Sequence, residues 1–163
     1  MKRLLIVFHT QGGHTGALAE AVLRGARRAT ETDTVMKRAG DATLEDLLGC
    51  HGLIVGTPEN FGTMSGMVKD FFDRTYYAVL GRVEGRPYAS IVCAGSDGQG
   101  AARQIDRIAT GWRLRRVADP LVVITNAQTP QAILATKRIG GADLARAHDL
   151  GSAMAAGVSL GVW

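Results

Sequence analysis

The chain has few cysteines and no long apolar run, and each shortage argues against a class of protein. Among its 163 residues, Cys50 and Cys93 are the two cysteines, and no C-x-x-C pair is present. This pattern argues against a disulfide-stapled secreted fold and against thiol-redox or zinc motifs. No apolar run approaches the roughly 18 residues that a membrane-spanning helix needs. The run at residues 4–8 is also too short for a signal peptide. We therefore expect reduced thiols, no membrane span and a cytoplasmic location.

Aromatic residues and excess charge are also scarce. Aromatic residues make up 6% of the chain, and 19 basic against 15 acidic side chains give a net charge of +4. The basic residues are not interleaved with aromatic ones, so a nucleic-acid partner is not expected. His51 and His148 have no cysteine, histidine or carboxylate at ligand spacing, so no metal site is expected. The length fits a single domain over residues 1–163.

Glycine, in contrast, is abundant, with 21 residues, roughly twice the usual ~7%. These glycines show no period, which argues against collagen-like and repeat folds. Several of them gather in loops that follow short apolar runs. This placement is a clue to function rather than to flexibility.

Strand and helix patterns alternate along the chain. Short apolar runs predict strands over residues 4–8, 34–36, 52–56, 88–94 and 121–124, and helical spacing of apolar residues predicts helices over 18–29, 43–48, 64–80, 101–112 and 144–158. Met64 and Met67 lie at helical spacing, which predicts that both belong to the core. The alternation predicts a doubly wound α/β fold with a parallel sheet. Such folds bind ligands outside the carboxyl ends of their strands.

Loop one, residues 9–16, connects the first predicted strand to the first predicted helix. Its sequence, His-Thr-Gln-Gly-Gly-His-Thr-Gly, lets backbone amides converge at a helix amino end, where a phosphate binds well. The hydroxyls of Thr10 and Thr15 add two possible donors. The alternative is a glycine-rich turn that has no ligand. The loop matches neither the G-x-x-x-x-G-K-[ST] nor the G-x-G-x-x-G pattern, which disfavours nucleoside triphosphatases and dinucleotide-binding folds.

Four segments together resemble the flavodoxin-like FMN proteins, in particular their NAD(P)H-dependent FMN and quinone reductase branch. Residues 10–15 are similar to the phosphate loop Ser/Thr-x-Thr-Gly-Asn-Thr, and residues 56–64 are similar to Gly-Thr-Pro-x-x-Phe/Tyr-Gly-x-Met. Lys69, Phe71, Asp73 and Arg74 are similar to the helical continuation Lys-x-Phe-x-Asp-Arg, and residues 95–100 resemble the third flavin loop. We call residues 56–63 loop two and residues 94–100 loop three. The resemblance implies a three-layer sandwich with helices on both faces of a five-stranded parallel sheet of order 2-1-3-4-5.

The resemblance also implies an FMN site built from these loops. It assigns Thr10, Gln11, Gly12, Gly13, His14 and Thr15 to the phosphate, Pro58, Glu59, Asn60, Phe61 and Gly62 to the flavin's pyrimidine edge and N5, and Gly95, Ser96, Asp97 and Gly98 to the other side of the ring. Gly12 stands where the family usually has threonine, which removes one hydroxyl donor. His14 replaces asparagine, as is frequent in the quinone-reductase branch.

The composition of the loops favours a reductase over an electron carrier. Phe61 is the only aromatic residue in the three loops, so a nicotinamide or quinone could stack on one open face of the ring. We therefore expect an enzyme that uses NAD(P)H to reduce quinones, free flavin or a similar small acceptor, without an identifiable catalytic acid or base. The alternatives are a flavodoxin-type electron-transfer protein and a binding module with a decayed flavin site. The resemblance also implies a homodimer or homotetramer.

Several residues keep two interpretations at this point. Glu59 and Asn60 either reach the flavin edge or form a solvated loop tip, and Asp97 either tunes the flavin potential or forms a turn. His14 is either a phosphate partner or simply the start of a helix, whereas His9 is expected to be a packed or hydrogen-bonded histidine. The arginines at 113, 115 and 116 either contact a 2′-phosphate or a neighbouring subunit, or lie on a solvated strand edge. The apolar tail at 158–163 either packs across an interface or folds back onto its own sheet.

Overall fold

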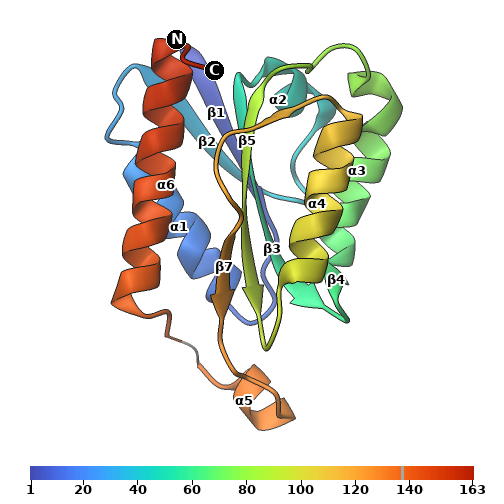
Figure 1. The fold of residues 1–163 in the computed structure, drawn as a ribbon, viewed down its shortest axis with the longest axis vertical. Helices are drawn as coiled ribbons and strands as arrows, with labels where there is room; N and C mark the ends of the chain where they lie inside the picture. The colour runs from blue at the N-terminus through green and yellow to red at the C-terminus, as the bar shows by residue number, and fades with distance from the viewer. Residues whose placement is uncertain (137) are drawn as a thin grey trace.

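The computed structural model describes residues 1–136 and 138–163, and its centre is a parallel sheet (Figure 1). Its five main strands are β1 (Lys2–Phe8), β2 (Thr32–Arg38), β3 (Gly52–Asn60), β5 (Pro87–Ala94) and β7 (Leu121–Ile124). They lie in the order β2-β1-β3-β5-β7, and every pairing between them is parallel. The parallel α/β class is confirmed, and the five main strands match the predicted order 2-1-3-4-5, although two further strands make the order of the whole sheet slightly different.

Two short strands were not predicted. β4 (Thr63–Met64) pairs antiparallel with the end of β3, and β6 (Arg115–Arg116) pairs with the first residues of β5. The described part of the chain therefore has seven strands rather than five. The outer position beside β5 is shared by β6 and β7, and Pro120, which lacks an amide donor, lies between them.

Helices cover both faces of the sheet and form the predicted three layers (Figure 1). One face carries α1 (His14–Ala26) and α6 (Gly141–Leu160), and the other carries α2 (Leu44–Gly49), α3 (Gly66–Val79) and α4 (Gln99–Gly111). The short α5 (Pro130–Leu134) has no buried residue and projects beyond the carboxyl ends of the strands. A capping box begins α2, since Thr43 and Asp46 bond each other's backbone amides.

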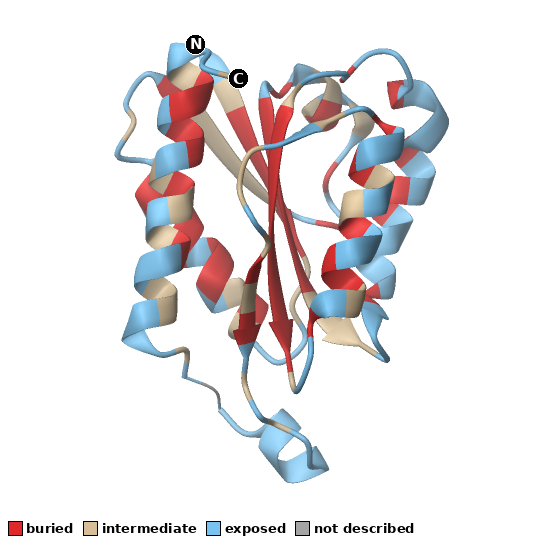
Figure 2. Ribbon diagram, in the orientation of Figure 1, coloured by how far each residue is buried: buried red, intermediate tan, exposed pale blue. Residues whose placement is uncertain are grey.

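The core consists of two apolar layers separated by the sheet, which Figure 2 shows as the buried centre of the molecule. Neighbouring strand residues point to opposite faces, so Leu5 packs under α2–α4 and Ile6 packs under α1 and α6. Helices α1 and α6 approach closely because of glycine: a Cβ at Gly25 would lie 1.8 Å from the carbonyl oxygen of His148.

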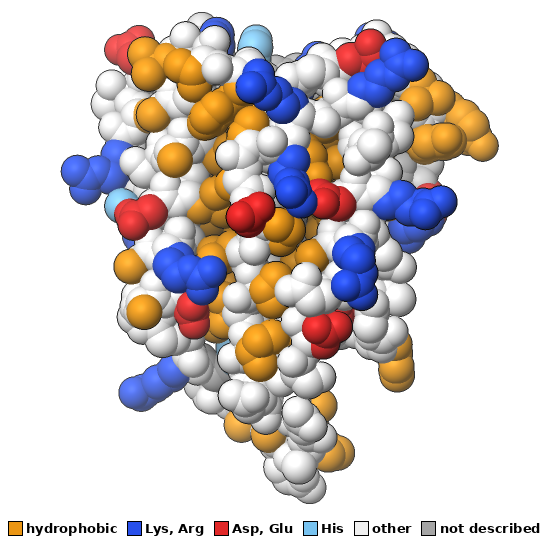
Figure 3. Space-filling model, viewed as in Figure 1, with side chains coloured by type: hydrophobic (Ala, Val, Ile, Leu, Met, Phe, Trp, Pro, Cys, Tyr) orange, Lys and Arg blue, Asp and Glu red, His pale blue; other side chains and the backbone are white. Residues whose placement is uncertain are grey.

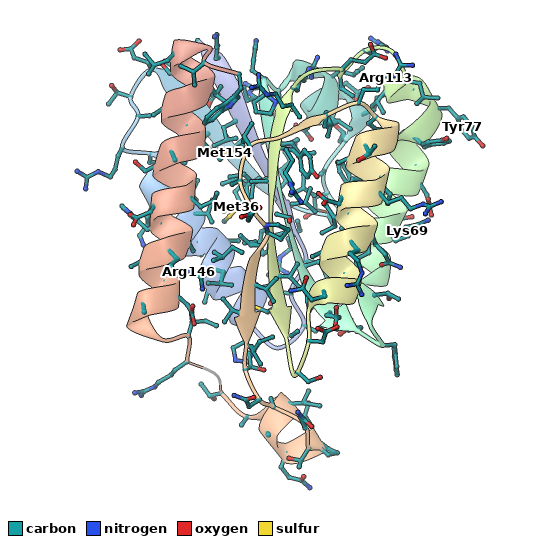
Figure 4. The ribbon with its side chains drawn as sticks, viewed as in Figure 1. Met36, Lys69, Tyr77, Arg113, Arg146 and Met154 are labelled. Atoms are coloured by element: carbon teal, nitrogen blue, oxygen red, sulfur yellow. The ribbon has the colours of Figure 1, made fainter. Side chains whose placement is uncertain are left out.

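The prediction for the start of the third main helix was wrong in two respects. Met64 is buried but lies in β4, and α3 begins at Gly66. Met67 is 42% exposed and does not belong to the core. Figure 4 shows a similar contrast: Tyr77 of α3 points into solvent, whereas Met154 of α6 points toward the sheet.

The chain's tail folds back onto its own sheet. The Trp163 ring packs so closely on Gly157 that a Cβ at Gly157 would lie 2.1 Å from it. Trp163 is part of the apolar layer beneath α1 and α6. Trp163 thus packs within the chain, whereas Leu160 and Val162 of the tail remain 76% and 58% exposed, and packing of the tail across an interface stays a prediction.

Candidate functional site

A cavity of about 410 Å³ lies at the carboxyl ends of the main strands. Its lining includes Thr10, Gln11, Gly12, His14, Thr15, Pro58, Glu59, Asn60, Phe61, Gly62, Gly95 and Ser96 from the predicted site. The topology thus brings loops one, two and three together around one space. Gly13, Asp97 and Gly98 are not part of this lining. Gly13 and Gly98 instead precede α1 and α4 as their N-cap residues, and Asp97 is exposed.

Loop one presents the open amino end of α1 to the cavity. Gly13 has a φ of +95°, which favours glycine, and its amide donates to Thr10 Oγ1 at 3.1 Å. The hydrogen bond from the Ala17 amide to the Gly13 carbonyl oxygen, at 2.9 Å, closes the first turn. The N-cap residue Gly13 has no side chain of its own to cap the helix, and the first turn contains no acidic residue. The first-turn amides and the helix dipole therefore favour an anion here.

The two histidines of loop one differ in position. The His9 amide donates to the Gly56 carbonyl oxygen at 3.0 Å, and the residue is outside the cavity lining. Burial, followed by the nearby Arg38 guanidinium, lowers the His9 pKa. His9 is thus a partly buried residue at the end of β1 whose backbone amide is hydrogen-bonded. His14 is both the first residue of α1 and part of the lining, so the geometry suits either of its two interpretations.

Loop two is shorter than predicted, because residues 56–60 continue strand β3 and residue 63 begins β4. The two strands form a β-hairpin. Asn60 pairs with Thr63, and the two residues between them, Phe61 and Gly62, have φ angles of +53° and +72°. Two positive φ angles are characteristic of the type I′ turn that suits two-residue hairpins. The turn leaves the Phe61 side chain fully exposed, at 105%, on the rim of the cavity.

The side chains of Glu59 and Asn60 do not form a free loop tip. The Asn60 Nδ2 donates to Gln11 Oε1 at 2.9 Å, which links loop two to loop one. The Glu59 carboxylate accepts hydrogen bonds from the Gly98 and Ala101 amides, each at 2.9 Å. Glu59 therefore occupies the amino end of α4 and links loop two to loop three.

A fourth segment of the lining was missed from the sequence. Thr125, Ala127, Gln128 and Ile133 line the cavity, together with Cys93 and Ala94 at the end of β5. The Thr125 amide donates to the Ala94 carbonyl oxygen at 2.8 Å, which holds this segment against loop three. The rule that identified the other loops, namely their position after a strand of the parallel sheet, would also have identified this one.

The arginine cluster lies at the other end of the sheet. Arg115 and Arg116 form the exposed strand β6 beside the start of β5, whereas the end of β5 lines the cavity. Arg116 pairs with Asp106 at 2.8 Å, and Arg113 pairs with Glu84 at 3.2 Å. The cluster thus lies on an exposed strand edge at the end of the sheet opposite the cavity, and its contact with a neighbouring subunit stays a prediction.

On the face seen in Figure 3, positively and negatively charged side chains lie next to one another.

Within the described residues, no helix is long and apolar enough to cross a membrane. The same residues include no group of three or more histidine, cysteine or acidic side chains arranged to hold a metal ion.

The fold and the position of the cavity define a flavodoxin-like protein. The chain superimposes on a flavodoxin from the domain Archaea with a TM-score of 0.77 and 20% identity, covering 96% of this chain and 98% of that one. A flavodoxin, WrbA-like protein from Agrobacterium tumefaciens gives a TM-score of 0.73 at 17% identity, covering 98% and 99% of the two chains. Identities this low establish the fold alone.

Residues 26–129 match the model of the NADPH-dependent FMN reductase family, and the chain belongs to this family. A curated relative named flavodoxin, from Aquifex aeolicus (strain VF5), is 37% identical over 100 residues. That match covers 61% of this chain and 52% of the relative, so it spans about half of the relative's length.

Proposed function

We propose that the chain binds FMN in this cavity, with the phosphate at the amino end of α1. The observation that carries the proposal is the difference between the two helix ends beside the cavity. The amino end of α4 already holds the Glu59 carboxylate, whereas α1 begins after the glycine N-cap Gly13 and has no acidic residue in its first turn. An anionic group is therefore favoured at loop one, and the ring of the same ligand would lie between loops two and three.

The residues present suit this ligand. A cavity of about 410 Å³ falls within the ~300–1,000 Å³ range of small-molecule sites. Thr10 and Thr15 supply hydroxyls, and the Thr10 hydroxyl can still donate, because it accepts the hydrogen bond from Gly13. Gly12 lines the cavity without a hydroxyl, so these two threonines and the first-turn amides would hold the phosphate.

We further propose that the chain, as one domain over residues 1–163, is an NAD(P)H-dependent reductase of quinones, free flavin or a similar small acceptor. Bound FMN would supply hydride and electron transfer, and the chain would orient the ring and shield it from water. Among the described lining residues, Phe61 is the one aromatic side chain, and it lies exposed at the rim. Much of the cavity mouth is thus free for a flat nicotinamide or acceptor ring.

An electron-transfer protein is the second candidate, because the Aquifex aeolicus relative carries the name flavodoxin. The two candidates differ in whether a nicotinamide reaches the flavin directly. A carrier would receive electrons from a protein partner instead.

The test is an anaerobic absorbance titration of the purified chain loaded with FMN. Addition of NADPH or NADH should bleach the flavin bands rapidly, and a quinone or free flavin should restore them. FMN that binds but is not bleached by either nucleotide would favour the carrier. A protein that binds no FMN would refute both candidates.

A further inference from the structure

Two neighbouring residues at the end of β3 connect three separate loops. Successive strand residues point to opposite sides, and here Asn60 reaches Gln11 of loop one while Glu59 reaches the start of α4. The two contacts differ in chemistry. The Asn60–Gln11 bond is exposed and joins two neutral amides, whereas Glu59 is a half-buried carboxylate that binds two backbone amides.

The Glu59 contact is a charge-assisted one at a helix terminus. Gly98 is the N-cap residue of α4, and Ala101 lies in its first turn. Their amides have no partner within the helix, and one carboxylate satisfies both at 2.9 Å. Hydrogen bonds from amides to a carboxylate are roughly twice as strong as those between neutral groups, and the helix dipole adds to the attraction.

Other contacts fix the same hairpin to α4. The Met64 amide donates to Gln104 Oε1 at 2.9 Å. The hairpin's turn lies directly on the first turn of the helix, because a Cβ at Gly100 would be 1.9 Å from the Gly62 carbonyl oxygen. Loops two and three therefore form one unit, and Glu59 is its charged connection on the cavity side.

We propose that Glu59 is a positioning residue for the ring end of the cavity. It sets the distance between loops two and three without contacting the phosphate end at loop one. The identity of the ligand rests on the proposed function, but the role of Glu59 in holding loop three does not. Removal of the Glu59 carboxylate should therefore weaken the binding of FMN and of riboflavin equally, because these ligands share the ring and differ in the phosphate.

The first test measures amide hydrogen exchange by NMR in the protein without added flavin. In Glu59→Ala, exchange at Gly98 and Ala101 should accelerate about tenfold or more, because each amide loses its acceptor. Glu59→Gln should restore part of the protection, since its amide group offers one acceptor oxygen where the carboxylate offers two. Glu45→Gln is the matched control, because Glu45 is an exposed acidic residue of α2, and it should leave both amides unchanged. Unchanged exchange in both Glu59 variants would overturn the proposal.

The second test measures the Kd of FMN and of riboflavin by quenching of flavin fluorescence. In Glu59→Ala, both Kd values should rise by the same factor, about fivefold or more. The reason is that loop three loses the two hydrogen bonds to the Glu59 carboxylate that hold it in place. A rise for FMN alone would overturn the proposal, because it would mean that Glu59 acts at the phosphate. If the unmodified chain binds neither flavin, the proposed function fails, while the exchange measurement still decides whether Glu59 holds loop three.

Discussion

Replacing Gly100 with alanine tests whether the hairpin tip of loop two is fixed against α4. The new Cβ would lie 1.9 Å from the Gly62 carbonyl oxygen and 3.3 Å from Glu59 Oε2. Ordinary contact begins at 3.4 Å, so the hairpin and the helix must separate by the difference, about 1.5 Å. The obstacle is backbone rather than a flexible side chain, so the strain cannot be relieved by a rotamer change.

The size of the effect follows from this displacement. Overpacking of this kind destabilises a protein by about 1–3 kcal/mol, which for a chain of this length lowers Tm by about 2–12 °C. A shift of about 1.5 Å also exceeds the ~0.5 Å tolerance of a binding site. It would stretch the two 2.9 Å hydrogen bonds between Glu59 and α4. We therefore expect the affinity for FMN to fall about tenfold or more.

Thermal unfolding and a fluorescence titration with FMN measure both effects. Gly111→Ala is the matched control, because Gly111 ends the same helix and a Cβ there meets nothing within 4 Å. That change should leave the FMN affinity unaltered and raise stability by up to about 0.5–1 kcal/mol. If Gly100→Ala behaves like Gly111→Ala in both assays, the described contact between hairpin and helix is wrong.

Three further changes probe the phosphate end, the rim and the acid stability. Thr10→Ala should lower the affinity for FMN about tenfold but the affinity for riboflavin little, because the lost hydroxyl would donate to the charged phosphate. Equal loss of affinity for both ligands would contradict this. Phe61→Ala should leave Tm unchanged, because the side chain is fully exposed, while weakening both flavins by about 1 kcal/mol of lost ring contact; a lower Tm in calorimetry would argue against its rim position. Burial raises the Asp46 pKa, but the hydrogen bonds from Lys37 and Thr43 outweigh it and hold the pKa below its usual value. Asp46 therefore stabilises the fold above the unfolded pKa of about 3.9, and this stability is lost as the pH falls through the lower folded value. In Asp46→Asn, the free energy of unfolding should fall less steeply as the pH is lowered. An unchanged pH dependence would contradict the stabilising role of Asp46.

Strands β1, β3 and β5 could be predicted because most of their residues are buried, whereas only three of the seven residues of the half-buried edge strand β2 were predicted. The run Leu4 to Phe8 is continuously apolar, which is typical of a strand covered by helices on both sides. The capping box of Thr43 and Asp46 is likewise a local pattern, because it depends on residues three positions apart. The three site loops were found for a similar reason, since loop position follows from strand order.

The hairpin and the helix-end contact could not be predicted. β4 depends on Phe61 adopting a positive φ, which is uncommon for a bulky residue, and Met64 fits a helical spacing equally well. The hydrogen bonds that Glu59 accepts from Gly98 and Ala101 join residues 39 and 42 positions apart. Such contacts arise from tertiary packing and leave no local pattern. The exposed helix α5 has no buried residue and hence no apolar period.

The most direct test is calorimetric titration of the purified chain with FMN and with riboflavin at the same salt concentration. A phosphate at the open amino end of α1 should make FMN bind about tenfold or more tightly than riboflavin, since each hydrogen bond to a charged group contributes about 1.5–3 kcal/mol. The advantage of FMN should shrink in Thr10→Ala. Equal affinities for the two flavins, or no binding of either, would contradict the assignment of the cavity as an FMN site with its phosphate at loop one.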